Sequence, residues 1–255
     1  MNRPGPRPQL TQGPASVDLY WLPLGAGAGN QLVRVSGYAY EALAAARQHR
    51  GRTDLYHSAL VVTLDGDTYA IEMAPVWSVR EPDRGVVAEG PVGLPWWGRS
   101  RLFRYEIRCW RGGTIPDLLA AVDSPRSVST DQGRARRLLE LAPSFPTATW
   151  GLDEHRAGEM WNSNSLTAWL LARSGHDTQA ASCRPPARGR APGWSAGLVV
   201  AARAGSDADE GGIDPADSAD LPFGLWNRLR FRLGRLDPGT RDTYGWTMPT
   251  HPHRS

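Results

Sequence analysis

Two β-rich runs separated by a two-residue turn signal constrain the fold of this chain more than any other stretch. Residues 55–64 (LYHSALVVTL) and 68–73 (TYAIEM) are rich in β-branched and aromatic side chains, and residues 65–67 between them read DGD. An Asp-Gly pair in this position is a strong signal for a tight turn, because both residues tolerate the left-handed conformation that the turn needs. The sequence therefore predicts an antiparallel β-hairpin here.

The register of this hairpin decides which polar side chains lie together. With a two-residue loop, paired positions sum to a constant value, so Ala59 opposes Glu72 and His57 opposes Ala74. His57 and Glu72 then share a face as diagonal neighbours, within reach of an imidazole–carboxylate hydrogen bond that would orient the ring and raise its basicity. A three-residue loop would put Glu72 on the opposite face. A lone strand histidine is also commonly structural, so both alternatives stay open.

A second informative stretch, residues 159–175, is typical of a helix with a polar first turn. Its apolar positions recur at helical spacing, and Gly175 stands where a C-terminal glycine cap is expected. Asn162 and Ser163 are both good N-caps, so we expect the helix to begin near Asn162. The free N–H groups and positive dipole end there favour a developing negative charge, which makes Ser163 a candidate nucleophile. The alternative is that these residues only cap a core helix.

The remaining sequence predicts a mixture of short strands and helices around these two elements. We expect strands at 17–24, 31–35, 85–90 and 101–110, helices at 40–50, 117–122 and 131–141, and either a strand or a short helix at 194–202. The fold class predicted is therefore α+β.

The composition divides the chain into one folded domain with polar flanks. Residues 1–16 are rich in Pro, Gly and Gln and are expected to be disordered, and residues 17–201 form the predicted domain. Residues 202–222 are expected to form an acidic linker. Residues 223–255 contain a short basic amphipathic helix, 223–236, and a disordered tail. That helix would contact an anionic membrane surface, bind a protein partner or dock back on the domain.

Several functional classes are disfavoured by composition. All 29 basic residues are Arg, and the net charge is only +3. The arginines are interleaved with acidic residues, so no basic stripe predicts nucleic-acid binding. Cys109 and Cys183 lack ligand spacing, and His155 with Glu159 lacks a third ligand, so we expect neither a metal nor another cofactor. The sequence shows no apolar run of membrane-spanning length and no signal-peptide pattern, and we therefore expect a cytoplasmic protein.

The order of these motifs resembles a known family. A histidine on a strand (55–62, LYHSALVV), a following YAIEMA at 69–74 and a later helix beginning WNSNSL at 161–166 are similar to the circularly permuted branch of the NlpC/P60 papain-like superfamily. This branch includes the lecithin retinol acyltransferase-like, PPPDE and YiiX-like proteins. The resemblance covers roughly residues 17–201 and implies an antiparallel sheet packed against helices.

The resemblance also implies roles for individual residues. His57 would be the general base, Ser163 the nucleophile in place of the family's usual Cys, and Glu72 a candidate third member. The polar neighbours Asn162, Asn164 and Ser165 are candidate binding residues.

Two functions are compatible with this site. The first is hydrolysis or acyl transfer on an amide, ester or thioester, with N–H groups at the helix start stabilising the oxyanion. The alternative is an inactive relative that binds a peptide, lipid or protein, because a serine hydroxyl needs stronger activation than a thiol.

Overall fold

The computed structural model describes residues 14–24, 53–78, 81–116, 118–187 and 189–210. Six strands form an antiparallel sheet in the order β4-β5-β3-β2-β1-β6, and β7 pairs in parallel with the start of β2. The strands are β1 Ser16–Pro23, β2 Asp54–Leu64, β3 Asp67–Pro75, β4 Val86–Pro91, β5 Arg104–Arg111, β6 Arg126–Ser129 and β7 Gly189–Arg190.

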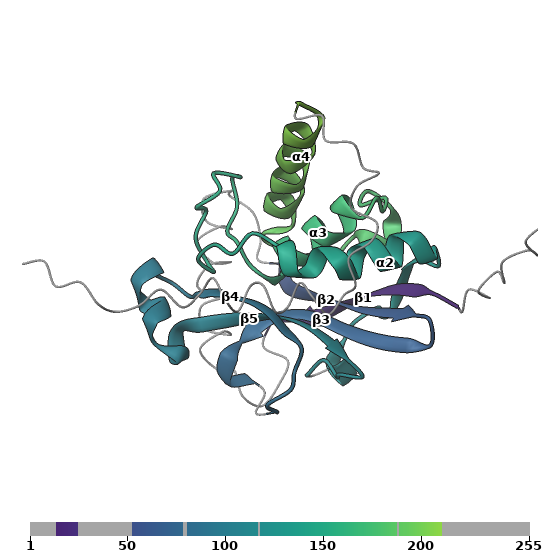
Figure 1. Ribbon diagram of the computed structural model, residues 1–255, viewed down its shortest axis with the longest axis horizontal. Helices are drawn as coiled ribbons and strands as arrows, with labels where there is room; N and C mark the ends of the chain where they lie inside the picture. Colours follow the sequence, from purple (N-terminus) through teal and green to yellow (C-terminus); the bar gives the residue numbers. More distant parts are fainter. Residues whose placement is uncertain (1–13, 25–52, 79–80, 117, 188, 211–255) are drawn as a thin grey trace, which may run out of the picture. The chain divides into compact units, whose positions relative to one another are not determined.

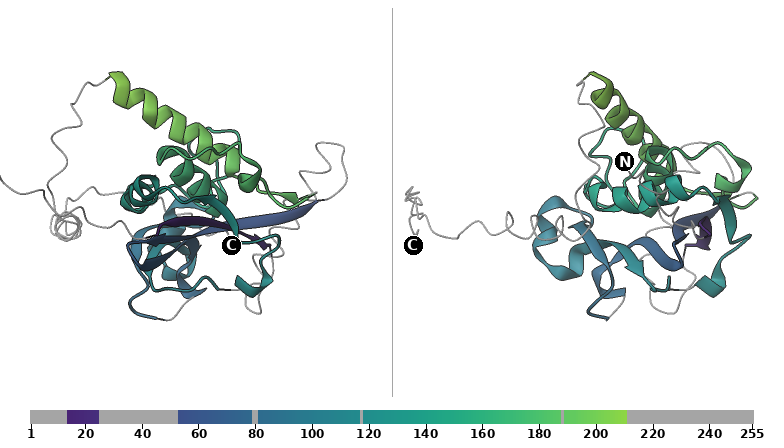
Figure 2. Two further views of the ribbon diagram at one scale, coloured as in Figure 1. Left: turned by 90° about the vertical axis from the view of Figure 1, so that its right-hand side faces the viewer. Right: turned by 45° about the vertical axis from the view of Figure 1, so that its right-hand side comes forward.

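Within the described residues, three α-helices complete the α+β fold on one side of this sheet. They are α2 Gln132–Leu141, α3 Ser163–Arg173 and α4 Trp194–Glu210. The helices α2 and α3 lie on one face of the sheet, and α4 packs against α3 (Figures 1 and 2). Short 3-10 turns occupy Val76–Ser78 (η1), Pro95–Arg99 (η2), Arg101–Phe103 (η3), Leu118–Ala120 (η4), Ala142–Ser144 (η5) and Ala181–Cys183 (η6).

The predicted hairpin is confirmed, together with its two-residue turn. Leu64 pairs with Asp67, and Asp65 and Gly66 both have positive φ values, 53° and 87°. This is the conformation that an Asp-Gly hairpin turn adopts. The ladder between β2 and β3 runs only as far as the pair Leu60–Ile71. The positions of His57 and Glu72 therefore lie beyond its end.

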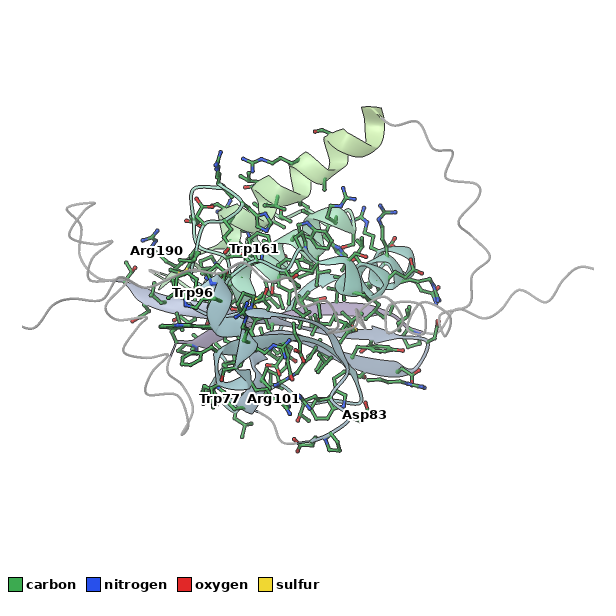
Figure 3. All side chains as sticks on the ribbon, turned by 60° about the vertical axis from the view of Figure 1, so that its left-hand side comes forward. Trp77, Asp83, Trp96, Arg101, Trp161 and Arg190 are labelled. Carbon is green, nitrogen blue, oxygen red and sulfur yellow. The ribbon has the colours of Figure 1, made fainter. Side chains whose placement is uncertain are left out.

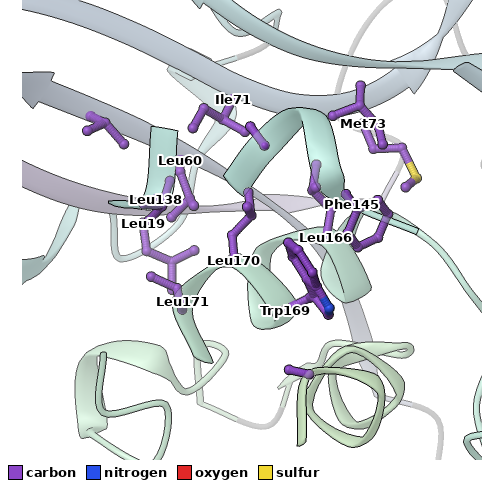
Figure 4. Close-up of a cluster of buried hydrophobic side chains, with 14 of the residues drawn as sticks. Leu19, Leu60, Ile71, Met73, Leu138, Phe145, Leu166, Trp169, Leu170 and Leu171 are labelled. Atoms are coloured by element: carbon purple, nitrogen blue, oxygen red, sulfur yellow. The ribbon is translucent and has the colours of Figure 1, made fainter. Parts of the chain in front are cut away.

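The main core fills the space between the helices and the sheet. Side chains from β1, β2 and β3 meet those from α2 and α3, among them Leu19, Leu60, Ile71, Met73, Leu138, Leu166 and Leu170 (Figure 4). Phe145 adds a stacked contact with Trp161 and an edge contact with Trp169, with ring centroids 4.9 and 5.5 Å apart. All residues of α3 from Ser163 to Leu171 are buried, so this helix is surrounded by protein on every side.

The element predictions are confirmed for most of the described chain. Strands were expected at 17–24 and 85–90 and a helix at 131–141, and β1, β4 and α2 occupy these positions. Two expectations are corrected in detail, because 101–103 and 118–120 form 3-10 turns instead of strand and α-helix. Strand β6 was not predicted from the sequence. The predicted elements at 31–35 and 40–50, and the segments 1–13 and 211–255, lie outside the described residues.

The last helix is longer than predicted. Residues 194–202 were expected to form a strand or a short helix, and α4 continues through Glu210 into the segment predicted as an acidic linker. No Gly-Pro or Pro signal interrupts residues 203–210, and the alanines there favour helix. Arg203 also donates hydrogen bonds from the helix to the carbonyl oxygens of His155 and Arg156, at 2.7 and 3.2 Å. No helix within the described ranges is long and apolar enough to cross a membrane.

Candidate functional site

The histidine and the serine singled out from the sequence meet in the structure. The Nδ1 atom of His57, on β2, lies 3.0 Å from the Oγ atom of Ser163, the first residue of α3. The two residues are 106 positions apart in the chain. A hydroxyl and an imidazole nitrogen at this distance satisfy the geometric condition for proton transfer between nucleophile and base.

The start of α3 is fixed by a capping box around Asn162. The Oδ1 atom of Asn162 accepts hydrogen bonds from the N–H groups of Asn164 and Ser165, and the Ser165 hydroxyl accepts one from the Asn162 N–H. Such reciprocal bonds satisfy the donors that a helix start leaves open. The predicted N-cap is thus confirmed, and it places Ser163 at the first helical position. Among the hydrogen bonds of the described residues, none uses the Ser163 N–H group.

Asn164 joins the helix to the strand that carries His57. Its Nδ2 group donates to the backbone oxygens of Tyr56 and Pro192, each at 2.9 Å, and its Oδ1 atom accepts from the Ser58 hydroxyl at 2.8 Å. The Asn164 side chain is buried, and both amide hydrogens and the oxygen have partners. Because Tyr56 and Ser58 flank His57, these bonds hold the imidazole beside Ser163.

A loop before α4 closes the other side of the helix start. Asn162 donates to the Pro192 oxygen at 2.8 Å, Ser165 donates to the Gly193 oxygen at 2.8 Å, and the Gly193 N–H donates to Glu159 at 2.8 Å. Gly193 has a φ of 88°, and a Cβ atom there would lie 2.4 Å from the Asn162 amide oxygen. Glycine is therefore required on both conformational and steric grounds.

The side chains of the candidate binding residues Asn162, Asn164 and Ser165 thus form hydrogen bonds within the protein. Their partners are backbone groups and Ser58, and all three side chains are buried. The observed contacts position the His57–Ser163 pair. A direct role of these three residues in ligand binding stays a prediction.

The surroundings of His57 favour its neutral form. Burial lowers the pKa of this histidine from 6.5 to about 4, although the residue as a whole is partly exposed. The imidazole is therefore neutral at pH 7 and can accept the Ser163 proton at Nδ1. Ser163 is only 3% exposed, so a ligand reaches the hydroxyl only if neighbouring side chains move.

Glu72, the candidate third catalytic residue, forms an ion pair with an arginine. Its Oε1 atom accepts a 2.9 Å hydrogen bond from Arg108, whose guanidinium also binds Glu106 at 3.1 Å. Arg84 binds Glu106 in turn, and all these groups except Arg84 are buried. Among the contacts between described residues, none joins Glu72 to His57. The role of Glu72 as the third member stays a prediction.

The other candidate chemistries find little support in the described part of the chain. Both cysteines are free, and burial raises their thiol pKa values, that of Cys109 to about 12, which disfavours thiolate chemistry. His155 packs edge-on against Trp161, with ring centroids 4.4 Å apart, whereas Glu159 binds Gly193. Within the described ranges, no cluster of three or more His, Cys, Asp or Glu residues could hold a metal ion.

Sequence reasoning missed the residues that hold the pair in place. Ser58, Glu159 and Gly193 contribute through tertiary contacts, and only the Pro192-Gly193 turn signal was visible in the sequence. Comparisons with family models, curated proteins and solved structures gave no match. The family resemblance therefore rests on the residues and geometry of this chain alone.

Proposed function

We propose that this protein is a hydrolase or acyltransferase that uses Ser163 as nucleophile and His57 as general base, on a permuted NlpC/P60 papain-like fold. The observation that carries the proposal is the 3.0 Å contact between His57 Nδ1 and Ser163 Oγ across 106 residues of chain. The α+β architecture and the order of strand histidine before helix-start serine support it. Substrates would be amides, esters or thioesters.

The proposed reaction proceeds in two steps. The Ser163 oxygen attacks the substrate carbonyl carbon while its proton passes to His57 Nδ1, and the Ser163 N–H group, which no hydrogen bond of the described residues uses, donates to the resulting oxyanion. The tetrahedral intermediate then expels an amine, alcohol or thiol, which takes the proton from His57. Water or a second acceptor, deprotonated by His57, attacks the acyl-serine ester, and the Ser163 oxygen leaves with the proton from His57 as the product is released.

This mechanism requires His57 to become protonated, and its burial makes that protonation costly. A pKa of about 4 instead of 6.5 makes the imidazolium about 3 kcal/mol more costly to form than in water. No carboxylate among the described contacts offsets this cost. A substrate-induced rearrangement that brings a carboxylate or more solvent to the ring would raise the basicity of His57.

The same observations favour a second candidate function. A nearly inaccessible Ser163 and a weakly basic His57 are properties expected of an inactive relative that retains the fold and binds a peptide, lipid or protein. The proposed enzyme and the proposed binding protein differ in one property, which is the nucleophilicity of Ser163.

A fluorophosphonate probe tests the enzyme directly. Wild-type protein should form a covalent adduct, detected by intact mass and mapped to Ser163, whereas Ser163→Ala and His57→Ala should not. Ser206→Ala, which removes an exposed hydroxyl of α4, is the matched control and should label like wild type. The labelling is done without substrate, both in the absence and in the presence of added lipid. If folded wild-type protein forms no adduct in either case, the enzyme proposal is contradicted.

A Ser163→Cys variant distinguishes the second function. The helix start lowers the pKa of a thiol placed there, so the variant should react rapidly with iodoacetamide, and His57→Ala in that background should slow the reaction. Cys109 and Cys183 give little background because burial raises their pKa values. An inert wild type beside a reactive, His57-dependent variant supports the binding protein. Equal rates with and without His57 would mean that the pair is only a helix cap.

A further inference from the structure

A cluster of exposed aromatic and apolar side chains projects from the edge of the sheet, away from the core. Residues 94–104 (LPWWGRSRLFR) form the turns η2 and η3 between β4 and β5, and we call them the aromatic–basic projection. Trp96 is 63% exposed and Leu102 70%, and Trp97 and Phe103 are exposed as well. Large apolar side chains gathered in this way are typical of an interaction surface.

The projection is a defined structure. The rings of Trp97 and Phe103 lie 4.8 Å apart and join the two turns, and Pro95 begins the first of them. A Cβ atom at Gly98 would lie 2.8 Å from the Pro91 side chain, so the turn packs closely on β4. The exposed rings are therefore held in place by ordered turns.

All charged side chains of the projection are positive. It contains three arginines and no acidic residue. Arg104 pairs with Glu89 at 3.1 Å, whereas Arg99 and Arg101 form no ion pair with any described residue and are both exposed. On a neighbouring turn, Trp77 is 43% exposed, and Figure 3 shows it beside Arg101.

These properties together fit one kind of partner. Tryptophan has an apolar body and a polar N–H group and is favoured at the boundary between lipid headgroups and acyl chains. Arginine is attracted to anionic headgroups. A neutral apolar partner would explain the aromatic side chains but not Arg99 and Arg101, which have no acidic partner among the described residues. We propose that the aromatic–basic projection docks the protein onto the surface of an anionic lipid bilayer.

The topology places this surface at the same end of the sheet as His57. The projection leads directly into β5, where Tyr105 pairs with Pro75 at the end of β3, and the antiparallel neighbour β2 begins at this end with Asp54 (Figure 1). The strand order β5-β3-β2 separates them sideways by two strand spacings, about 10 Å. A bilayer-bound substrate would thus be brought near Ser163. This last consequence rests on the proposed enzyme function, whereas the docking itself does not.

Vesicle flotation with the full chain tests the docking. Wild-type protein should bind vesicles of equimolar phosphatidylglycerol and phosphatidylcholine more strongly than vesicles of phosphatidylcholine alone, and the binding should weaken with added salt. The double variant Arg99→Gln/Arg101→Gln should lose about 25-fold in partition coefficient, about fivefold for each arginine. Trp96→Ala should lose about tenfold on anionic vesicles.

Matched controls separate the projection from other surfaces. Arg134→Gln removes an exposed arginine of α2 and should bind like wild type, as should Leu119→Ala, which removes an exposed leucine of η4. Ser163→Ala should also bind like wild type, so that loss of activity and loss of docking remain distinguishable. Thermal unfolding of each variant shows whether its fold is intact.

Three outcomes would overturn the docking proposal. One is equal binding to neutral and anionic vesicles, and another is wild-type affinity in both the arginine and the Trp96 variants, which would place any binding elsewhere in the chain. The third is the absence of vesicle binding combined with self-association that Trp96→Ala abolishes, because the projection would then be an interface between copies of the chain.

Discussion

Replacing His57 by Gln should remove a pH-dependent contribution to stability that follows from the burial of the imidazole. Burial lowers the pKa of the folded-state histidine to about 4, whereas the unfolded chain retains the ordinary value of 6.5. Between these two values the unfolded chain binds the proton and the folded protein does not. The contribution of His57 to stability therefore rises with pH across this window. It is fully present above pH 6.5 and is lost as the pH falls toward 4.

The size of the effect follows from the same two values. Between about pH 8 and about pH 5, the wild-type protein should lose about 2 kcal/mol of unfolding free energy through His57 alone. Glutamine is similar in size and still accepts a hydrogen bond from the Ser163 hydroxyl, but it does not titrate. Other groups, including His155 and His176, titrate in both proteins, so their contributions cancel in the difference.

The measurement is urea-induced unfolding of wild type and His57→Gln at both pH values, with the slope of the transition checked for constancy. The difference in stability between the two proteins should change by about 2 kcal/mol across the pH interval, with wild type losing more at low pH. Parallel pH profiles would refute the reasoning, since they would mean that the folded-state imidazole has an ordinary pKa. An NMR titration of the His57 ring then reports the value directly.

Three further predictions concern the supports of the site and the sheet, each measured by equilibrium unfolding. Asn164→Ala removes three buried hydrogen bonds and should cost about 3 kcal/mol; a loss below about 1 kcal/mol would show that the amide bonds contribute little net stability. Gly197→Ala would place a Cβ atom 2.3 Å from a backbone oxygen of α3 and should cost about 2–3 kcal/mol, whereas Gly205→Ala in the same helix meets nothing closer than 3.6 Å and should gain about 0.5–1 kcal/mol. The two glycine variants changing stability in the same direction would contradict the close approach of α3 and α4. Arg108→Met removes the guanidinium that binds both buried carboxylates, Glu72 and Glu106, and should cost about 3–5 kcal/mol; a cost below about 1 kcal/mol would contradict a structural role of this ion-pair cluster.

Much of the fold was predictable because its signals are local. The Asp65-Gly66 turn fixed the hairpin, and the Asn162 cap and Gly175 marked both ends of α3; the glycine takes a positive φ of 81° there. The extent of α4 was missed because its C-terminal half has no apolar periodicity, and its contacts through Arg203 are tertiary. The short strand β6 carries no alternation that distinguishes it from a loop.

The site was predictable only in part. The residue types and the helix start identified Ser163 and His57, and the structure brings them together. The hairpin register suggested Glu72 as the partner of His57, but Arg108 on the neighbouring strand binds that carboxylate. A cross-strand ion pair of this kind depends on strand order, and one sequence does not show that β5 lies beside β3. The buried network around Asn164 was equally invisible.

The bonds that Asn164 and Ser163 form with β2 have a consequence for synthesis of the chain. Their partners precede them by 106 to 108 residues, which at ribosomal rates is a delay of about 5–20 s. Until α3 leaves the ribosome, β2 and β3 have β5 and β1 beside them but only α2 over their helix-facing side, so part of their apolar face stays uncovered. A message truncated before codon 163 would yield strands β1 to β6 and α2 without α3, β7 and α4. Such a product should depend on chaperones for solubility, whereas the finished chain acquires its nucleophile and the rest of the cover for its sheet in the same event.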